Sequence, residues 1–296
     1  MGPKLTKFEH NRDFERVSRF LVETYRTAGT HLNWLQPRWE YMHYHPLIRD
    51  VNVSQIGLWE DDGHIVGVIH PEHEEGTVYL QIRDDNPALK KQMLQYAEQH
   101  LSIIAGGLRR LRVLINRADQ SFQGIATAAG YDKTELCESM SEWVLPSSVC
   151  PPPLPEGFHL KSLAEDNDLY RVEDALWRGF EHQGEPPVGW LEDRQFAQSA
   201  PNYRKDLNIV VEAPSGCFVS YCGMWLEPTY AVAYVEPVAT VPEFRRRGLA
   251  RTAVLEGVRR CVASGAERAY VGGTLPLYES LGFRTIFYTD VWQRSW

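Results

Sequence analysis

The spacing of apolar positions changes repeatedly along the chain, and each change marks a strand or a helix. In the segment 249–262, apolar side chains recur at helical spacing, which predicts an amphipathic helix. The runs 207–213 and 217–225 are rich in β-branched and aromatic residues and flank a short turn, which predicts a hairpin. Further second-half strands are predicted at 159–163, 230–239, 268–272 and 285–293, and helices at 168–180 and 275–281.

The first half shows a similar order of elements. A predicted helix at 13–25 precedes a hairpin formed by 54–60 and 64–70. The pattern then predicts a strand at 77–83, a helix at 89–101, and strands at 110–115 and 141–145. The two halves therefore follow one plan.

A proline-rich segment separates the halves. Residues 148–157 read as a linker, because proline removes backbone donors and breaks helices. We therefore expect an α+β (layered α/β) chain with two tandem domains, 1–147 and 158–296. Each is expected to be a mixed central sheet flanked by helices.

Composition narrows the classes of function. The 296-residue chain has a formal net charge of −8, so we expect no nucleic-acid partner, since nucleic-acid-binding faces are basic. No apolar run approaches the length of a bilayer span and no hydrophobic signal core is visible, so we expect a cytoplasmic protein without a membrane partner. The five cysteines contain no Cys-x-x-Cys pair, and we expect reduced thiols and no metal.

Three consecutive arginines, 245–247, stand between a predicted strand and a predicted helix. The first turn of a helix offers backbone N–H groups without intrahelical partners, at the positive end of the helix dipole. Gly248 and Ala250 keep the approach free of bulky side chains, and arginines add charge-assisted bonds to phosphate. The pattern predicts a diphosphate-binding turn; a solvated basic helix cap is the alternative.

The segment 238–250 resembles the coenzyme A motif of the GNAT family of N-acetyltransferases. Arg245, Gly248 and Ala250 match its Arg/Gln-x-x-Gly-x-Gly/Ala pattern, with Pro242 upstream. The segment 277–283 is similar to the family's closing motif, in which a tyrosine, here Tyr278, stands four residues before the glycine of a Gly-Phe pair. The whole chain resembles tandem GNAT proteins, although its first half does so by element order only.

This resemblance implies acetyl-CoA bound between two splayed central strands. The Val238 N–H would hold the thioester oxygen as it becomes an oxyanion, Tyr278 would donate a proton to the sulfur, and Glu236 is the candidate base. Packing for Tyr278 and a strand ion pair for Glu236 are the alternatives. The implied cofactor-binding residues are Val238, Ala239 and Thr240 along the pantetheine arm, and Arg245, Arg246, Arg247, Gly248, Leu249, Ala250 and Arg251 around the diphosphate.

In the family's fold, the first helices and their loop line the acceptor pocket. The corresponding candidates here are Trp177, Phe180, Glu181, His182 and Trp190. They suit an amine on an apolar or aromatic body, although core packing accounts for the aromatic residues equally well; His182 is an alternative base. We expect direct acetyl transfer, in a ternary complex, to a small-molecule primary amine, by a monomer or homodimer. A non-catalytic acyl-CoA sensor and an O-acyl or longer-chain transferase stay open.

The first half lacks the motif's chemistry. Asp84 and Asp85 stand where a diphosphate would be repelled, and Ala126 occupies the position that matches Tyr278. We therefore expect a degenerate GNAT-like domain at 1–147 and the catalytic domain at 158–296. In the aromatic stretch 31–46, His43 and His45 suggest a metal site, but no third ligand lies nearby. A structural cluster is favoured, and a share in substrate binding stays open.

Overall fold

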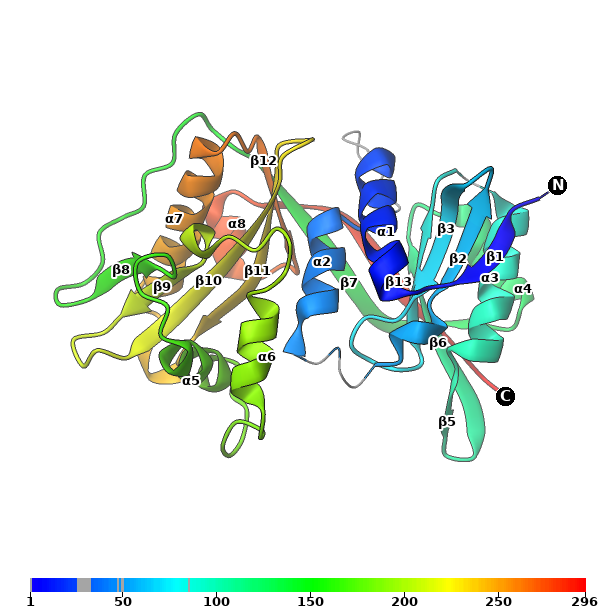
Figure 1. The fold of residues 1–296 in the computed structure, drawn as a ribbon, viewed down its shortest axis with the longest axis horizontal. Helices are drawn as coiled ribbons and strands as arrows, with labels where there is room; N and C mark the ends of the chain where they lie inside the picture. The colour runs from blue at the N-terminus through cyan, green and yellow to red at the C-terminus, as the bar shows by residue number, and fades with distance from the viewer. Residues whose placement is uncertain (1, 26–32, 47, 49–50, 85) are drawn as a thin grey trace. The chain divides into compact units, whose positions relative to one another are not determined.

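A computed structural model describes residues 2–25, 33–46, 48, 51–84 and 86–296. The chain forms two compact units, whose helices and strands are labelled in Figure 1. The first unit comprises Met1–His43, Leu47–Met140 and Thr285–Trp296, and the second comprises Tyr44–Pro46 and Ser141–Arg284.

The first unit is built on a mixed sheet with the strand order β1-β2-β3-β4-β6-β13, and β5 pairs with β6. Apolar side chains on one sheet face, including Ile69, Val78 and Val113, form a core with Met93 and Phe122 from its helices. Its strands are β1 (Lys4–Lys7), β2 (Gly57–Asp61), β3 (His64–His70), β4 (Thr77–Ile82), β5 (Ile103–Ala105), β6 (Leu108–Asn116) and most of β13 (Arg284–Ser295). Its helices are α1 (His10–Thr24), α3 (Pro87–His100), α4 (Gln120–Ala128), the 3-10 turn η2 (Val53–Gln55) and all but the last residue of α2 (Gln36–Tyr44).

The second unit is built on a sheet with the order β12-β11-β10-β9-β8. Only the β11–β12 pair is parallel; its neighbours are antiparallel. Its strands are β8 (His159–Ser162), β9 (Ile209–Glu212), β10 (Phe218–Glu227), β11 (Val232–Thr240) and β12 (Arg268–Gly272). Its helices are α5 (Leu169–Gly179), α6 (Trp190–Ala197), α7 (Leu249–Ala263) and α8 (Pro276–Leu281), with 3-10 turns η3 (Lys205–Leu207) and η4 (Pro242–Phe244).

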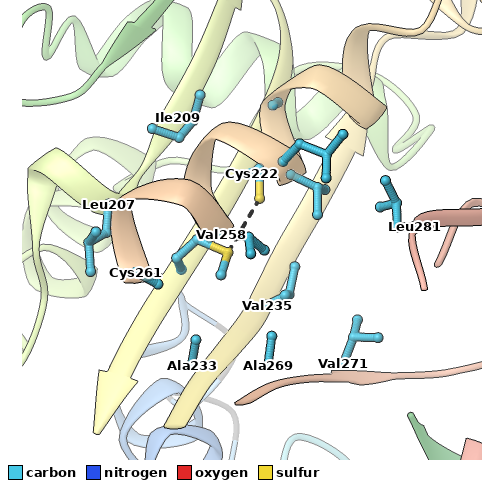
Figure 2. Close-up of a cluster of buried hydrophobic side chains, with 14 of the residues drawn as sticks. Leu207, Ile209, Cys222, Ala233, Val235, Val258, Cys261, Ala269, Val271 and Leu281 are labelled. Atoms are coloured by element: carbon cyan, nitrogen blue, oxygen red, sulfur yellow. Dashed lines mark hydrogen bonds between the residues drawn. The ribbon is translucent and has the colours of Figure 1, made fainter. Parts of the chain in front are cut away.

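The two faces of this second sheet carry separate cores. Because side chains alternate along a strand, Ile209 and Val211 join the α7 core, while Val210 joins the core under α5. Figure 2 shows the α7 core, where Cys222 and Val235 from the sheet meet Val258 from the helix. A mixed sheet with helices in each unit confirms the predicted layered α+β class.

The units differ from the predicted domains at the end of the chain. The predicted second domain contained the last strand, but β13 pairs antiparallel with β6 from Thr289 to Ser295 and belongs to the first unit. Conversely, β7 (Asp132–Val144) enters the second unit at Ser141, where Glu142 bonds to Arg268 at 2.9 Å and to the Tyr270 hydroxyl at 2.6 Å. Strand pairing is a long-range choice that local periodicity does not encode.

The proline-rich segment 148–157 also differs from its expected role. Both of its flanks lie in the second unit. Val149 is buried in the α7 core, Leu154 packs against that core, and the Thr252 hydroxyl donates to the Pro152 carbonyl at 3.3 Å. The segment is therefore part of the second unit, on the surface of α7.

Trp292 provides a test of the place of β13. Its side chain is buried in the first unit's core, so Trp292→Ala should lower the free energy of unfolding of that unit by about 3–5 kcal/mol. Denaturant unfolding measures this loss. The control is Trp296→Ala, because Trp296 is 37% exposed and its ring stacks under Arg294, a contact worth roughly 0.5–1 kcal/mol. Equal effects of the two substitutions would contradict the placement.

Candidate active site

The turn between β11 and α7 presents a row of free backbone donors. Thr240 ends β11, η4 follows, and Arg246 and Gly248 take the left-handed conformation with φ of 60° and 80°. The Thr252 N–H is the first in α7 to bond back, to the Gly248 carbonyl at 3.0 Å. Within the described chain, no group accepts a hydrogen bond from the N–H groups of residues 246–251.

This row of donors has the features expected of an anion site. The α7 N-cap is Gly248, which offers no capping side chain, and a Cβ built there meets nothing within 4 Å. The N–H groups are therefore open to a ligand and lie at the positive end of the helix dipole.

The arginine side chains around the turn differ in how many hydrogen bonds they make to the protein. Arg245 is held by protein groups: it donates to the Thr240 carbonyl at 3.0 Å, the Gly179 carbonyl at 2.9 Å and the Glu181 carboxylate at 2.9 Å. The Arg246 side chain is exposed and bonds to no described residue. The backbone, and not the Arg245 guanidinium, therefore offers the free donors.

Arg247 and Arg251 each contact residues near the turn. Arg247 donates to the Glu243 carbonyl at 3.1 Å, and Arg251 donates to the Ser280 hydroxyl at 3.1 Å. Arg247 also stacks on the Phe244 ring at 5.2 Å, and Arg251 also donates to the Ser280 carbonyl at 3.3 Å. Leu249 is buried beneath the turn, whereas Ala250 is half-buried and small. Both arginines leave most of their donors unused.

Strand β11 has a free edge just before this turn. It pairs with β12 only from Val232 to Val235, yet it continues to Thr240. The Val241 N–H donates to the Val219 carbonyl at 3.0 Å. Because successive residues alternate across an antiparallel pair, the N–H groups of Val238 and Thr240 face away from β10. Past Val235, β11 therefore has outward N–H groups that no described strand pairs with, while Ala239 faces β10.

A β-bulge opens this edge, and the residues that permit it were missed from sequence. Cys222 lies opposite Val238, whereas Met224 lies opposite Val235, so β11 carries one extra residue. A Cβ at Gly223 would stand 2.5 Å from the Glu236 carbonyl oxygen, and Trp225 Nε1 donates to the same oxygen at 3.0 Å. The sequence does carry a signal for this bulge, because a glycine inside a strand often marks one.

Tyr278 on α8 lies near this bulge. It is 7% exposed, and its hydroxyl bonds to no described residue. Burial raises the pKa of the phenol, and the nearby Cys222 thiol and Glu236 carboxylate raise it further. The phenol therefore favours its protonated form, and the charge of the half-buried Glu236 acts on it.

The predicted acceptor residues fall into two groups. The rings of Trp177 and His182 lie 4.5 Å apart, and Phe180 lies 6.3 Å from His182. Trp190 instead packs against Tyr170, at the other end of α5, with ring centroids 5.1 Å apart. Two helical turns, about 10 Å, separate Tyr170 from Trp177, so Trp190 does not join the cluster formed by Trp177, Phe180 and His182.

Gly179 brings the end of α5 against β11, and it too was missed from sequence. A Cβ there would stand 2.8 Å from the Ala239 Cβ and 3.2 Å from the Thr240 nitrogen. Glycine therefore permits the close approach that places the acceptor cluster beside the free edge.

The histidine-rich stretch of the first half forms a buried aromatic cluster. His43 lies 4.2 Å from the Trp39 ring and 5.4 Å from the Phe8 ring, and burial holds its pKa well below the usual value. Neither it nor His45 belongs to any metal-capable group of three or more His, Cys, Asp or Glu side chains in the described ranges. His31 lies outside the described residues. No helix of the described chain is long and apolar enough to cross a membrane.

The chain is similar to known proteins in sequence and in fold. Residues 169–283 match the model of the acetyltransferase (GNAT) family. A GCN5-related N-acetyltransferase from Sphaerobacter thermophilus is 16% identical, with a TM-score of 0.66 over 99% of this chain and 95% of that chain. A tandem GNAT protein from the clavulanic acid biosynthesis pathway is 11% identical, with a TM-score of 0.66 over 99% and 98%. A GNAT acetyltransferase from Colwellia psychrerythraea is 9% identical, with a TM-score of 0.61 over 98% of each chain. Comparison with curated proteins found no match.

At these identities, the solved structures show the fold of the whole chain. The family match covers the part of the second unit that contains β11, the turn at 246–251 and Tyr278. The GNAT fold binds acyl-CoA and supports acyl-CoA-dependent acyl transfer. Residues 169–283 are therefore a domain of the acetyltransferase (GNAT) family, within a chain that has the tandem GNAT fold.

Proposed function

We propose that the second unit is an acetyl-CoA-dependent N-acetyltransferase that acts on a small-molecule primary amine. The observation that supports it most is the run of free N–H groups at 246–251, directly after a strand edge without a neighbour. A diphosphate fits the first feature, and an amide-containing arm fits the second, because it can pair with the edge as an added strand.

The residues around the bulge suit the chemistry of direct transfer. The Val238 N–H, which faces away from β10, stabilises the oxygen of the thioester as negative charge develops there. Glu236, directly or through water, accepts a proton from the ammonium of the acceptor. The amine nitrogen then bonds to the acetyl carbon, and the carbon–sulfur bond breaks as Tyr278 donates its proton to the departing sulfur. The new amide nitrogen releases its second proton to water, from which the Tyr278 phenolate is reprotonated.

The acceptor side is proposed from the cluster of Trp177, Phe180 and His182. Phe180 is 48% exposed, so an apolar or aromatic body on the amine would bury surface that water now covers. Glu181 is paired with Arg245 at 2.9 Å and is therefore assigned to positioning the loop rather than to holding the amine. We propose a cytoplasmic monomer or homodimer without nucleic-acid or membrane partners, in keeping with the net charge of −8.

Calorimetric titration with acetyl-CoA tests the cofactor site. The wild-type protein should bind, and Gly248→Trp should abolish binding because an indole would cover the free N–H row. Gly265→Trp is the matched control: Gly265 follows the other end of α7, with φ of 97° and nothing within 4 Å of its built Cβ. Absence of binding by the wild type would overturn the proposed function. Retained affinity in Gly248→Trp would place the cofactor site away from this turn.

Tyr278→Phe tests the proton donor. Loss of the hydroxyl should lower kcat by roughly 10- to 1,000-fold while the affinity for acetyl-CoA stays unchanged. Because the pKa of Tyr278 is raised, its hydroxyl stays protonated as the pH rises through about 10, the usual pKa of a tyrosine. The decrease in kcat caused by Tyr278→Phe should therefore appear at every pH of the pH–rate profile. Unchanged kcat at every pH would remove Tyr278 from the mechanism.

Gly179→Ala tests the contact between α5 and the strand edge. The added methyl would push against Ala239 and Thr240, and we expect the Kd for acetyl-CoA to rise about tenfold, or ~1.4 kcal/mol. Gly124→Ala is the control, because Gly124 lies inside α4 and a Cβ there meets nothing within 4 Å. It should keep the affinity, and equal affinities in both variants would show that α5 does not position the edge.

A further inference from the structure

The first unit contains a strand edge that corresponds to the free edge of β11. Strand β4 pairs with β6 only from Thr77 to Tyr79, although it continues to Ile82. The Arg83 N–H donates to the Val66 carbonyl at 3.0 Å. By the alternation of an antiparallel pair, the N–H and carbonyl of Ile82 face away from β3. Ile82 is therefore the counterpart of Thr240.

In the first unit, a side chain of the protein itself hydrogen-bonds to this strand edge. The Ile82 N–H donates to Asn33 Oδ1 at 2.8 Å, and Asn33 Nδ2 donates to the Ile82 carbonyl at 2.7 Å. The same Nδ2 donates to the Thr24 hydroxyl, at the end of α1, at 3.0 Å. One primary amide thus satisfies both outward groups of Ile82, as a paired strand or a bound amide would. Reversing the amide would lose both bonds to Ile82.

The residues beside Asn33 pack against the same part of β4. The Trp34 N–H donates to Gln81 Oε1 at 2.7 Å. The Trp34 ring lies 4.6 Å from the Tyr79 ring, and the Arg38 guanidinium stacks on the indole at 4.1 Å. Side chains of this unit therefore pack on β4 where its pairing with β6 ends.

The start of α3 is closed in the same way. Asn86 is its N-cap, and Asn86 Oδ1 accepts the Leu89 N–H at 3.1 Å. Pro87 contributes no N–H at all. By contrast, the N-cap of α7 is Gly248, which has no side chain to offer. The expected repulsion by Asp84 adds to this closure, while Asp85 lies outside the described residues.

We propose that Asn33 and Asn86 act as built-in ligands of the first unit. They occupy the two anchor points, the strand edge and the helix start, that an acyl-CoA would use, so the first unit is self-occupied and the chain carries one acyl-CoA site. The location of those anchor points rests on the function proposed for the second unit.

Residue-resolved hydrogen exchange on the full chain without acetyl-CoA tests the role of Asn33. The Ile82 amide should be protected in the wild type and should exchange at least tenfold faster in Asn33→Ala. The control is Asn52→Ala, which removes an exposed amide bonded to Ser54 and should leave Ile82 protected. Exchange of β6 amides such as that of Val113 verifies that each variant is folded. An unprotected Ile82 amide in the folded wild type would overturn the proposal.

Adding acetyl-CoA completes the test. Binding should protect the Thr240 amide and the amides at 246–251, with one equivalent per chain and no change at Ile82 or Leu89. Two equivalents per chain, or new protection at Ile82 and Leu89, would overturn the self-occupied first unit alone. Absence of binding would overturn the function proposed for the second unit, while Ile82 exchange in the ligand-free protein would still decide the role of Asn33.

Discussion

The candidate site depends on one strand edge that has lost its neighbour. Past Val235, β11 has no pairing with β12, and the outward N–H groups of Val238 and Thr240 face no strand of the described chain. A backbone donor shielded from water without a partner costs free energy, so such an edge favours whatever supplies an acceptor. The bulge permitted by Gly223 and the close approach permitted by Gly179 determine where this edge opens.

The two units meet the same constraint in different ways. The second unit keeps the edge and the helix start open. Its N-cap is a glycine, and of the two outward backbone groups of Thr240, Arg245 engages the carbonyl and leaves the N–H free. The first unit satisfies both with asparagine side chains, and its β3–β4 ladder runs without the register shift seen between β10 and β11. The same fold therefore leaves these backbone groups free for a ligand in one unit and satisfies them internally in the other, depending on a few polar side chains.

Local features were predictable from sequence, and long-range ones were not. The helix at 249–263 and the turn at Gly248 follow from apolar spacing and from one glycine, both of which act within a few residues. The pairing of β13 with β6 and the bonds between Asn33 and Ile82 join positions far apart in the chain. The inward direction of Arg245 was also unpredictable, because its acceptors come from α5 and β11.

The place of β13 in the first unit has a consequence for the order in which the protein is made. A ribosome synthesises residues 141–284, all that the second unit needs apart from Tyr44–Pro46, before it reaches Thr285. The first unit, whose synthesis begins earlier, must hold the outer edge of β6 without a partner until β13 emerges. The first unit therefore begins synthesis first but can complete its sheet only last. During translation, the unpaired edge of β6 is where the nascent chain would need protection from aggregation.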